Sequence, residues 1–122
     1  MVHVSLDRFE ELVADALDSI PPELGDELEN VAVVIEEWPT EEQLEGRGGT
    51  LLGLYEGVPL TERGPLSYAG AMPDHITVFR GPLCELARDE HDLAAQVRVT
   101  VLHEIGHYFG MTDDHLEELG WA

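Results

Sequence analysis

Two histidines, a glutamate and an aspartate near the end of the chain stand at spacings that suit metal chemistry. His103 and His107 are four residues apart, so on a helix they lie one turn apart on the same face. Both imidazoles can then reach one ion, and Zn²⁺ readily binds imidazole nitrogen and carboxylate oxygen. Glu104 follows the first histidine, where it can reach a water on the metal rather than the metal itself. The spacing therefore predicts a metal site with Glu104 as the catalytic general base.

A third protein ligand has to come from beyond this helix, because a catalytic zinc keeps three protein ligands and one position for water. Gly110 predicts the helix end, since glycine adopts the left-handed conformation that follows many helix C-termini. The chain can then reverse and return Asp113, which stands three residues after the glycine, where extended zincin motifs place their last ligand. His115 is the rival and Asp114 a weaker one. The geometry alone would allow His115.

The alternative to a metal site is a buried helix whose histidines have ordinary packing roles. H-E-x-x-H alone is a short pattern that arises by chance, but the glycine and the acidic residue at fixed offsets make chance occurrence much rarer. The helix that carries the motif is also apolar on most sides, which predicts that it is buried. Buried histidines need partners, and a metal would supply one. The metal site is therefore the preferred interpretation.

Length and charge limit the fold and the partners. The chain has 122 residues, which suits one domain spanning 1–122. Its formal net charge is -20, with 26 acidic against 6 basic residues. Such a surface repels phosphate backbones and anionic lipid, so we expect neither nucleic acid nor a membrane as a partner. Cys84 is the only cysteine, which excludes an internal disulfide and predicts a buried small apolar group. Without a signal-peptide pattern or a membrane-length apolar run, the expected location is cytoplasmic.

The elements that must position the motif can be read from hydrophobic periodicity. Apolar residues at three- and four-residue intervals predict an amphipathic helix over about 6–19. The β-branched run at 31–37 predicts a strand buried on both faces, and the acidic and then glycine-rich stretch at 39–50 predicts a surface loop. A second strand is expected over 51–55, with Gly53 as a bulge or a point of close approach.

The second half of the chain contains a third strand and two helices. Residues 76–79 predict the strand, and Pro82 predicts the first position of a short helix that runs to about Ala87. Asp89 or Asp92 caps the long motif helix. Gly106 in the middle of that helix lowers helix propensity, which a close approach of its backbone to the sheet would explain.

Several stretches together resemble the small bacterial zincin-like metallopeptidases, which are described as having a matrix-metalloprotease-like domain. The motif itself, His103–Asp113, carries most of the likeness. The other stretches that carry it are Phe9–Val13, Leu51–Arg63, Thr77–Pro82 and Glu118–Trp121. The resemblance implies an α+β, minimal zincin-like fold in which a small mixed sheet packs against the N-terminal helix and the motif helix. It also implies one Zn²⁺ per chain, held by His103, His107 and Asp113, with Glu104 as the catalytic base.

Two departures from larger relatives bear on activity. Metzincins, whose extended motif is partly similar, have a methionine turn after the third ligand, whereas here no methionine follows Asp113. Nine residues follow Asp113, which predicts almost no lower subdomain to form the wall of a cleft. The expected function is a zinc-dependent peptidase that binds a peptide or protein substrate along a sheet edge. The alternative is a non-catalytic metal-binding or protein-interaction domain that keeps the zincin shape.

Overall fold

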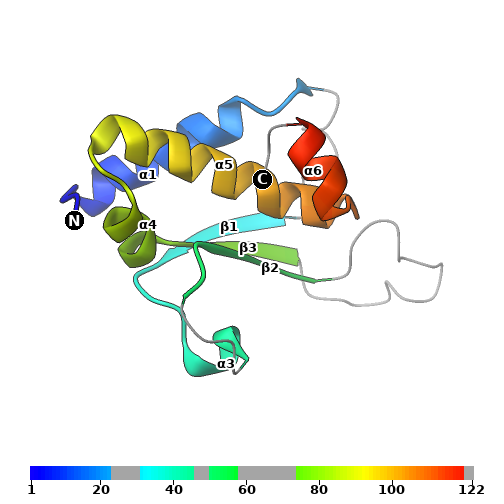
Figure 1. The fold of residues 1–122 in the computed structure, drawn as a ribbon, viewed down its shortest axis with the longest axis horizontal. Helices are drawn as coiled ribbons and strands as arrows, with labels where there is room; N and C mark the ends of the chain where they lie inside the picture. The colour runs from blue at the N-terminus through cyan, green and yellow to red at the C-terminus, as the bar shows by residue number, and fades with distance from the viewer. Residues whose placement is uncertain (23–30, 46–49, 58–73, 120–122) are drawn as a thin grey trace.

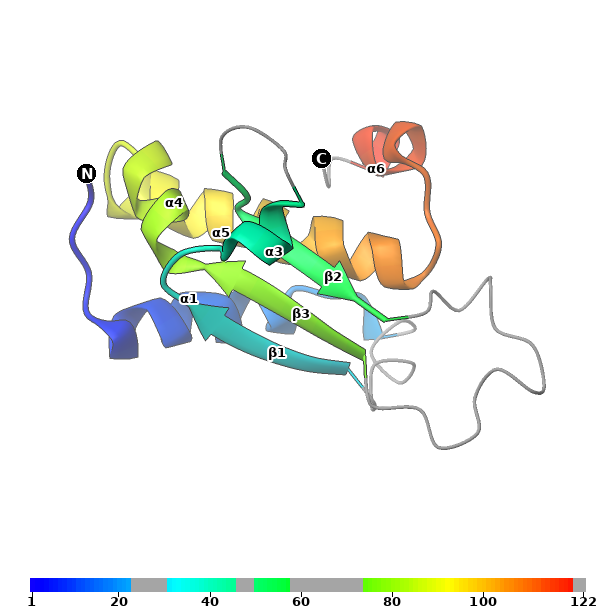
Figure 2. The ribbon, with the colours of Figure 1, turned by 90° about the horizontal axis from the view of Figure 1, so that it is seen from below.

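A three-stranded mixed sheet supports the helices that carry the motif. The computed structural model describes residues 1–22, 31–45, 50–57 and 74–119, and of Asp113 and Leu119 it describes the backbone alone. The strands are β1 (Val31–Glu36), β2 (Gly53–Glu56) and β3 (Asp74–Phe79), in the spatial order β1-β3-β2. The central strand β3 runs parallel to β1 and antiparallel to β2 (Figure 2). The α+β class and the small mixed sheet that the sequence predicts are thus confirmed.

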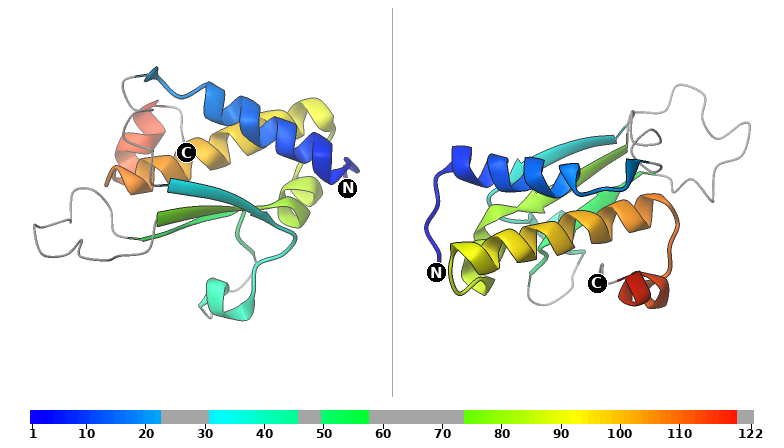
Figure 3. Two further views of the ribbon diagram at one scale, coloured as in Figure 1. Left: turned by 180° about the vertical axis from the view of Figure 1, so that it is seen from behind. Right: turned by 90° about the horizontal axis from the view of Figure 1, so that it is seen from above.

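Two helices cover one face of this sheet. They are α1 (Leu6–Asp18) and α5 (Glu90–Tyr108), which lie side by side and run roughly along the strands (Figures 1 and 3). The Ser5 side chain caps α1 by accepting a hydrogen bond from the backbone N–H of Arg8. The core fills the space between these helices and the sheet; its largest fully buried members include Phe9, Ile76, Leu83, Leu93, Val78, Val97, Val101 and Ile105.

The long helix α5 begins and ends where the sequence predicts. Asp89 is its N-cap, and the Asp89 side chain accepts a hydrogen bond from the backbone N–H of Asp92 at 2.7 Å. The last residue of the helix is Tyr108, and Phe109 is its C-cap. Gly110 follows with a φ of 76°, in the left-handed region that glycine adopts at low cost. These two ends fix the length of the helix and so the position of the histidines along it.

Further short helices lie outside the α1–α5 pair in the part of the chain that the structure describes. They are α3 (Glu41–Leu44) on the face of the sheet away from α5, α4 (Arg80–Leu86) between β3 and α5 in sequence, and α6 (Asp113–Leu119) after the motif (Figure 1). The prediction that 39–50 is all loop is wrong at α3. There, Thr40 and Gln43 form a capping box, in which each side chain accepts a hydrogen bond from the other's backbone N–H. Residues 46–49 of that stretch lie outside the described residues.

The prediction that the first strand is buried on both faces is also wrong. Along β1, half-buried residues alternate with exposed Ala32 and Val34, and Val34 is 40% exposed. The strand lies at the edge of the sheet, and the helices α1 and α5 cover only one of its faces. β-Branched residues favour a strand in either setting, so their density does not report how many faces are covered.

Two smaller predictions concern α4. The helix begins at Arg80, so Pro82 occupies its first turn rather than its first position, which an N-terminal turn tolerates because its N–H groups have no partner in the helix. Cys84 on the same helix is buried, as predicted, and desolvation raises the pKa of its thiol. Within the described residues, no helix combines the length and the apolar content needed to cross a bilayer.

Candidate metal centre

The motif residues lie together on the last third of α5. His103, Glu104 and His107 each offer a ligand atom, and these atoms all lie within 4.8 Å of one another. The two imidazole rings have centroids 4.5 Å apart and planes inclined at 70°. This closeness follows from the helix, since residues three and four apart share a face. The prediction that one helical turn brings the imidazoles of His103 and His107 together is therefore confirmed.

Glu104 is the most buried of the three. Its residue is 6% exposed, whereas His103 and His107 are half-buried. The Oε1 atom of Glu104 lies 3.2 Å from Nδ1 of His107, within hydrogen-bond distance. A carboxylate in such a position needs a polar partner, because an unpaired buried charge is costly. The imidazole supplies that partner and holds the carboxylate beside the histidines.

Gly53 of β2 makes room for this carboxylate. A Cβ atom at position 53 would lie 3.2 Å from Cγ of Glu104 and 2.7 Å from Cγ2 of Thr100. Any side chain larger than hydrogen would therefore push α5 away from β2 or displace Glu104. The prediction that Gly53 marks a close approach is confirmed, and the partner is the motif helix itself.

Beyond Glu104 the same strand is fixed to α5 by aromatic side chains. Tyr55 lies on the same face of β2 as Gly53 and packs edge to face on Tyr108, with ring centroids 6.0 Å apart. Its hydroxyl donates a 2.7 Å hydrogen bond to Oδ2 of buried Asp74. The close approach at Gly53 and the packing of Tyr55 on Tyr108 thus hold β2 directly over the motif.

The chain turns back after the motif helix, as the glycine predicts. The backbone N–H of Met111 donates to the carbonyl of Gly106 at 2.9 Å, and α6 then begins at Asp113. Leu116 of α6 is fully buried against Gly106, where a Cβ atom would overlap its side chain. The prediction that Gly106 lets the helix backbone approach the sheet is therefore wrong. The glycine instead makes room for the side chain of Leu116 on α6.

The structure describes the side chains of two of the three candidate third ligands, Asp114 and His115, but not that of Asp113. The side chain of Asp113 lies outside what the structure describes, so its role as a ligand stays a prediction. Asp114 and His115 are described and exposed, and neither joins the group formed by the two histidines and Glu104. The backbone N–H of His115 donates to Oγ1 of Thr112, at the start of α6.

The donor set suits a divalent metal ion. The two imidazole nitrogens are donors that Zn²⁺ accepts, and the carboxylate of Glu104 lies beside them. They are partly accessible from solvent through the half-buried histidines, which an ion and a substrate both require. The sequence reasoning missed Val99 and Thr100, which border the same site. Their positions four and three residues before His103 could have revealed them, since that spacing places them one turn away on the same face.

Comparison with known proteins agrees with this geometry. The model of the zincin-like metallopeptidase family matches residues 28–121. Among solved structures, the chain is similar to a conserved hypothetical protein from Thermus thermophilus, with 30% sequence identity and a TM-score of 0.58. That alignment covers 95% of this chain and 97% of the other. No curated protein matches. The family model includes the whole motif and most of the chain, and the chain therefore belongs to the zincin-like metallopeptidase family.

Proposed function

We propose that the protein is a zinc-dependent peptidase. His103, His107 and Asp113 hold the ion, and Glu104 is the general base. The observation that carries this proposal is the grouping of His103, Glu104 and His107 on one face of α5, with their ligand atoms within 4.8 Å. Membership of the zincin-like metallopeptidase family supports the same assignment. When bound, zinc supplies a Lewis acid that polarises the scissile carbonyl and lowers the pKa of a coordinated water toward about 7.

Glu104 moves the protons of the reaction. Its carboxylate takes a proton from the attacking water as the new carbon–oxygen bond forms. It then passes that proton to the amine nitrogen as the peptide carbon–nitrogen bond breaks, which leaves a carboxyl group and a free amine as products. Its buried position beside His107 supports this role, because a held carboxylate does not have to reorganise during the reaction.

The edge strand β2 offers a place for the substrate backbone. Within the described sheet, β2 pairs with β3 on one side and has no strand on the other. An extended peptide can add to such an edge through main-chain hydrogen bonds, with alternate side chains facing the helix. Because Gly53 of β2 lies against Glu104, a peptide in this position passes beside the general base.

The test is Glu104→Gln, which keeps the shape of the side chain and removes the base. Zinc content should be unchanged, while cleavage of a broad peptide library should fall by about 10²–10⁴-fold. Glu85→Gln, at an exposed position on α4, is the matched control and should cleave like the parent. Cleavage by Glu104→Gln at the parental rate would refute the mechanism. If no peptide is cleaved in a chelator-sensitive way by the parent, the non-catalytic metal-binding or interaction domain becomes the better interpretation.

A further inference from the structure

A buried carboxylate that the proposed mechanism does not use lies at the start of β3. Asp74 is buried, and its Oδ2 atom accepts the 2.7 Å hydrogen bond from the hydroxyl of Tyr55. It also lies against Gly57, where a Cβ atom would overlap the carboxylate. Asp74 stands two residues before Ile76, the partner of Tyr55 in the sheet, so the side chains of Asp74 and Tyr55 share one face. A carboxylate enclosed in this way fixes the position of the tyrosine hydroxyl.

Tyr55 connects this carboxylate to the motif helix. Its ring packs edge to face on Tyr108, the last residue of α5, with ring centroids 6.0 Å apart. Tyr108 is itself buried and also packs edge to face on Phe109, with ring centroids 5.2 Å apart. The side chain of Tyr55 therefore links three elements, because it belongs to β2, its hydroxyl binds β3 and its ring contacts α5.

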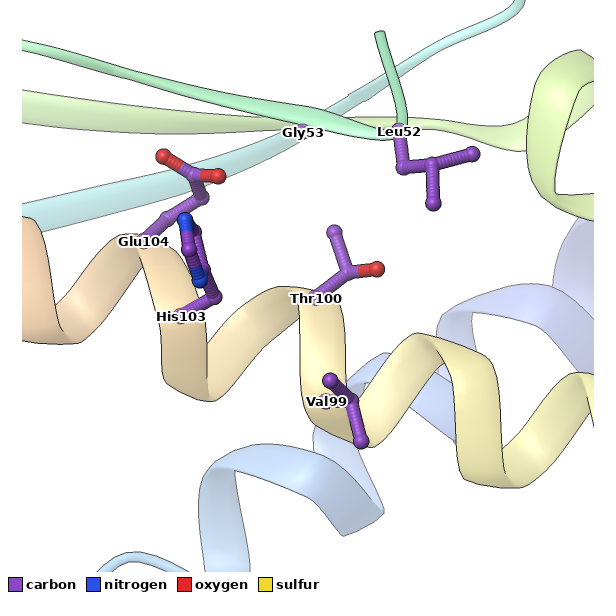
Figure 4. A pocket seen from close by; sticks show the side chains of 6 residues that line it. All are labelled: Leu52, Gly53, Val99, Thr100, His103 and Glu104. Carbon is purple, nitrogen blue, oxygen red and sulfur yellow. The ribbon is translucent and has the colours of Figure 1, made fainter. Parts of the chain in front are cut away.

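The residues of α5 that meet β2 form one stripe, with the general base in its middle. Thr100, Glu104 and Tyr108 are four residues apart, so they share one face of the helix, and all three are buried. Gly53 lies against Thr100 and Glu104, and Figure 4 shows both side chains pointing from the helix toward it. Tyr55 lies against Tyr108 at the other end of the stripe. Glu104 is therefore bracketed by contacts between β2 and α5.

Packing alone does not fix the general base on every side. A cavity of about 240 Å³ borders Glu104, and Gly53 and Val99 line the same cavity. The strand that lies over Glu104 is short, since β2 has four residues and pairs within the described sheet with β3 alone. The spacing between β2 and α5 at Glu104 therefore depends on how firmly this strand is held. The hydrogen bond from Tyr55 to Asp74 anchors the strand beyond the point where it passes the base.

We propose that Asp74 and Tyr55 are positioning residues for Glu104, and that their hydrogen bond sets the spacing between β2 and α5 that holds the general base in place. The inference rests on the proposed function, because it takes Glu104 as the base. Catalytic groups have to be held within about 0.5 Å of the productive geometry, and a displacement of about 1 Å can lower a rate by about 10²-fold. Loss of the hydrogen bond should therefore affect the chemical step more than the binding of substrate or metal.

The first measurement reports the spacing between β2 and α5 and needs neither metal nor turnover. The Cγ2 methyl group of Thr100 would be the nearest neighbour of a Cβ atom at Gly53, so the NMR cross-relaxation between that methyl group and the Hα protons of Gly53 reports the spacing. Tyr55→Phe removes the hydroxyl but keeps the ring, and Asp74→Ala removes the acceptor. Both should weaken the cross-relaxation. Asp74→Asn keeps an oxygen that can accept from the tyrosine, so it should retain most of the signal. Parental cross-relaxation in both Tyr55→Phe and Asp74→Ala would overturn the proposal.

The second measurement compares kcat and KM of the zinc-loaded variants at a temperature where all of them are folded. Tyr55→Phe and Asp74→Ala should each lower kcat by at least about tenfold and leave KM within about threefold, as expected when transition-state stabilisation is lost. A merely structural role would lower the free energy of unfolding and leave kcat unchanged. The double variant should lose no more than the weaker of the two single variants, because both substitutions remove one hydrogen bond. Asp15→Ala, at an exposed position on α1, is the control and should match the parent.

The two proposals fail in different ways. Weakened cross-relaxation in the variants, without cleavage of any peptide by the zinc-loaded parent, would refute the peptidase and support the role of the pair in the spacing. Cleavage by the parent with an unchanged kcat in both single variants would support the peptidase and overturn the positioning role. A loss of zinc affinity that matches the loss of kcat would also overturn it, because the pair would then act on the metal ligands rather than on Glu104.

Discussion

Leu116 of α6 lies against Gly106 of α5, inside the histidine motif. Leu116 is fully buried, and a Cβ atom at position 106 would overlap its side chain. The contact fixes α6, which starts at Asp113, against the helix that carries His103 and His107. Gly106 therefore allows the chain to turn back after α5. The predicted third ligand, Asp113, depends on this turn.

This contact makes Gly106→Ala a destabilising change. Alanine in place of glycine normally stabilises a helix by about 1 kcal/mol, but overpacking of a filled core costs about 1–3 kcal/mol. We expect the overlap with Leu116 to dominate and to lower the free energy of unfolding, measured by urea denaturation. In a Leu116→Ala background the overlap is gone, so the same substitution should become stabilising. Equal effects in both backgrounds would show that the two residues do not interact.

The third ligand can be decided by zinc affinity. Asp113→Ala should weaken zinc binding by more than the roughly 10–100-fold that is typical for loss of a group that only supports a ligand. His115→Ala is the matched control, because His115 is exposed on the same short helix and lies outside the described donor group. Competition against a chelating dye gives both affinities. A loss of affinity in His115→Ala, with Asp113→Ala unchanged, would assign the third ligand to His115.

Asp92 should make the stability of α5 depend on pH. The backbone N–H of Arg88 donates a 2.9 Å hydrogen bond to the Asp92 carboxylate, and this bond is the main reason that the pKa of Asp92 is lowered. A group whose pKa is lower when folded stabilises the protein above its unfolded pKa, which is about 3.9 for aspartate. That contribution is lost as the pH falls through the lowered folded pKa.

The test compares Asp92→Asn with the parent in urea at pH 7 and at pH 3. Asp92→Asn should be less stable than the parent at pH 7, and the difference should shrink at pH 3. Asp15→Asn, the same substitution at an exposed position on α1, controls for the general effect of replacing a surface carboxylate by an amide. A constant difference between Asp92→Asn and the parent at both pH values would contradict the stated origin of the shift.

The elements with strong local signals could be predicted from sequence. Asp89 and Gly110 mark the two ends of α5 through their own side-chain or backbone chemistry, and the structure uses both. The meeting of His103 and His107 is likewise a property of one helical turn. Such features need only a few neighbouring residues, so they do not depend on how the chain packs elsewhere.

The features that were missed depend on contacts between distant segments. The exposed face of β1 follows from the strand's place at the edge of the sheet, which its own residues do not encode. The partner of Gly106 comes from α6, and the cavity beside Glu104 needs Gly53 and Val99 from two different elements. A glycine in the sequence shows that something approaches closely, but only the fold shows what does.

The measurement that tests the central claim most directly is the zinc content of the purified protein by elemental mass spectrometry. The parent and His115→Ala should each contain about one zinc per chain, and His103→Ala should lose it, because His103 supplies one of three protein ligands. Absence of zinc from the parent even after zinc is offered, or full retention of zinc in His103→Ala, would contradict the assignment of α5 as the metal-binding helix.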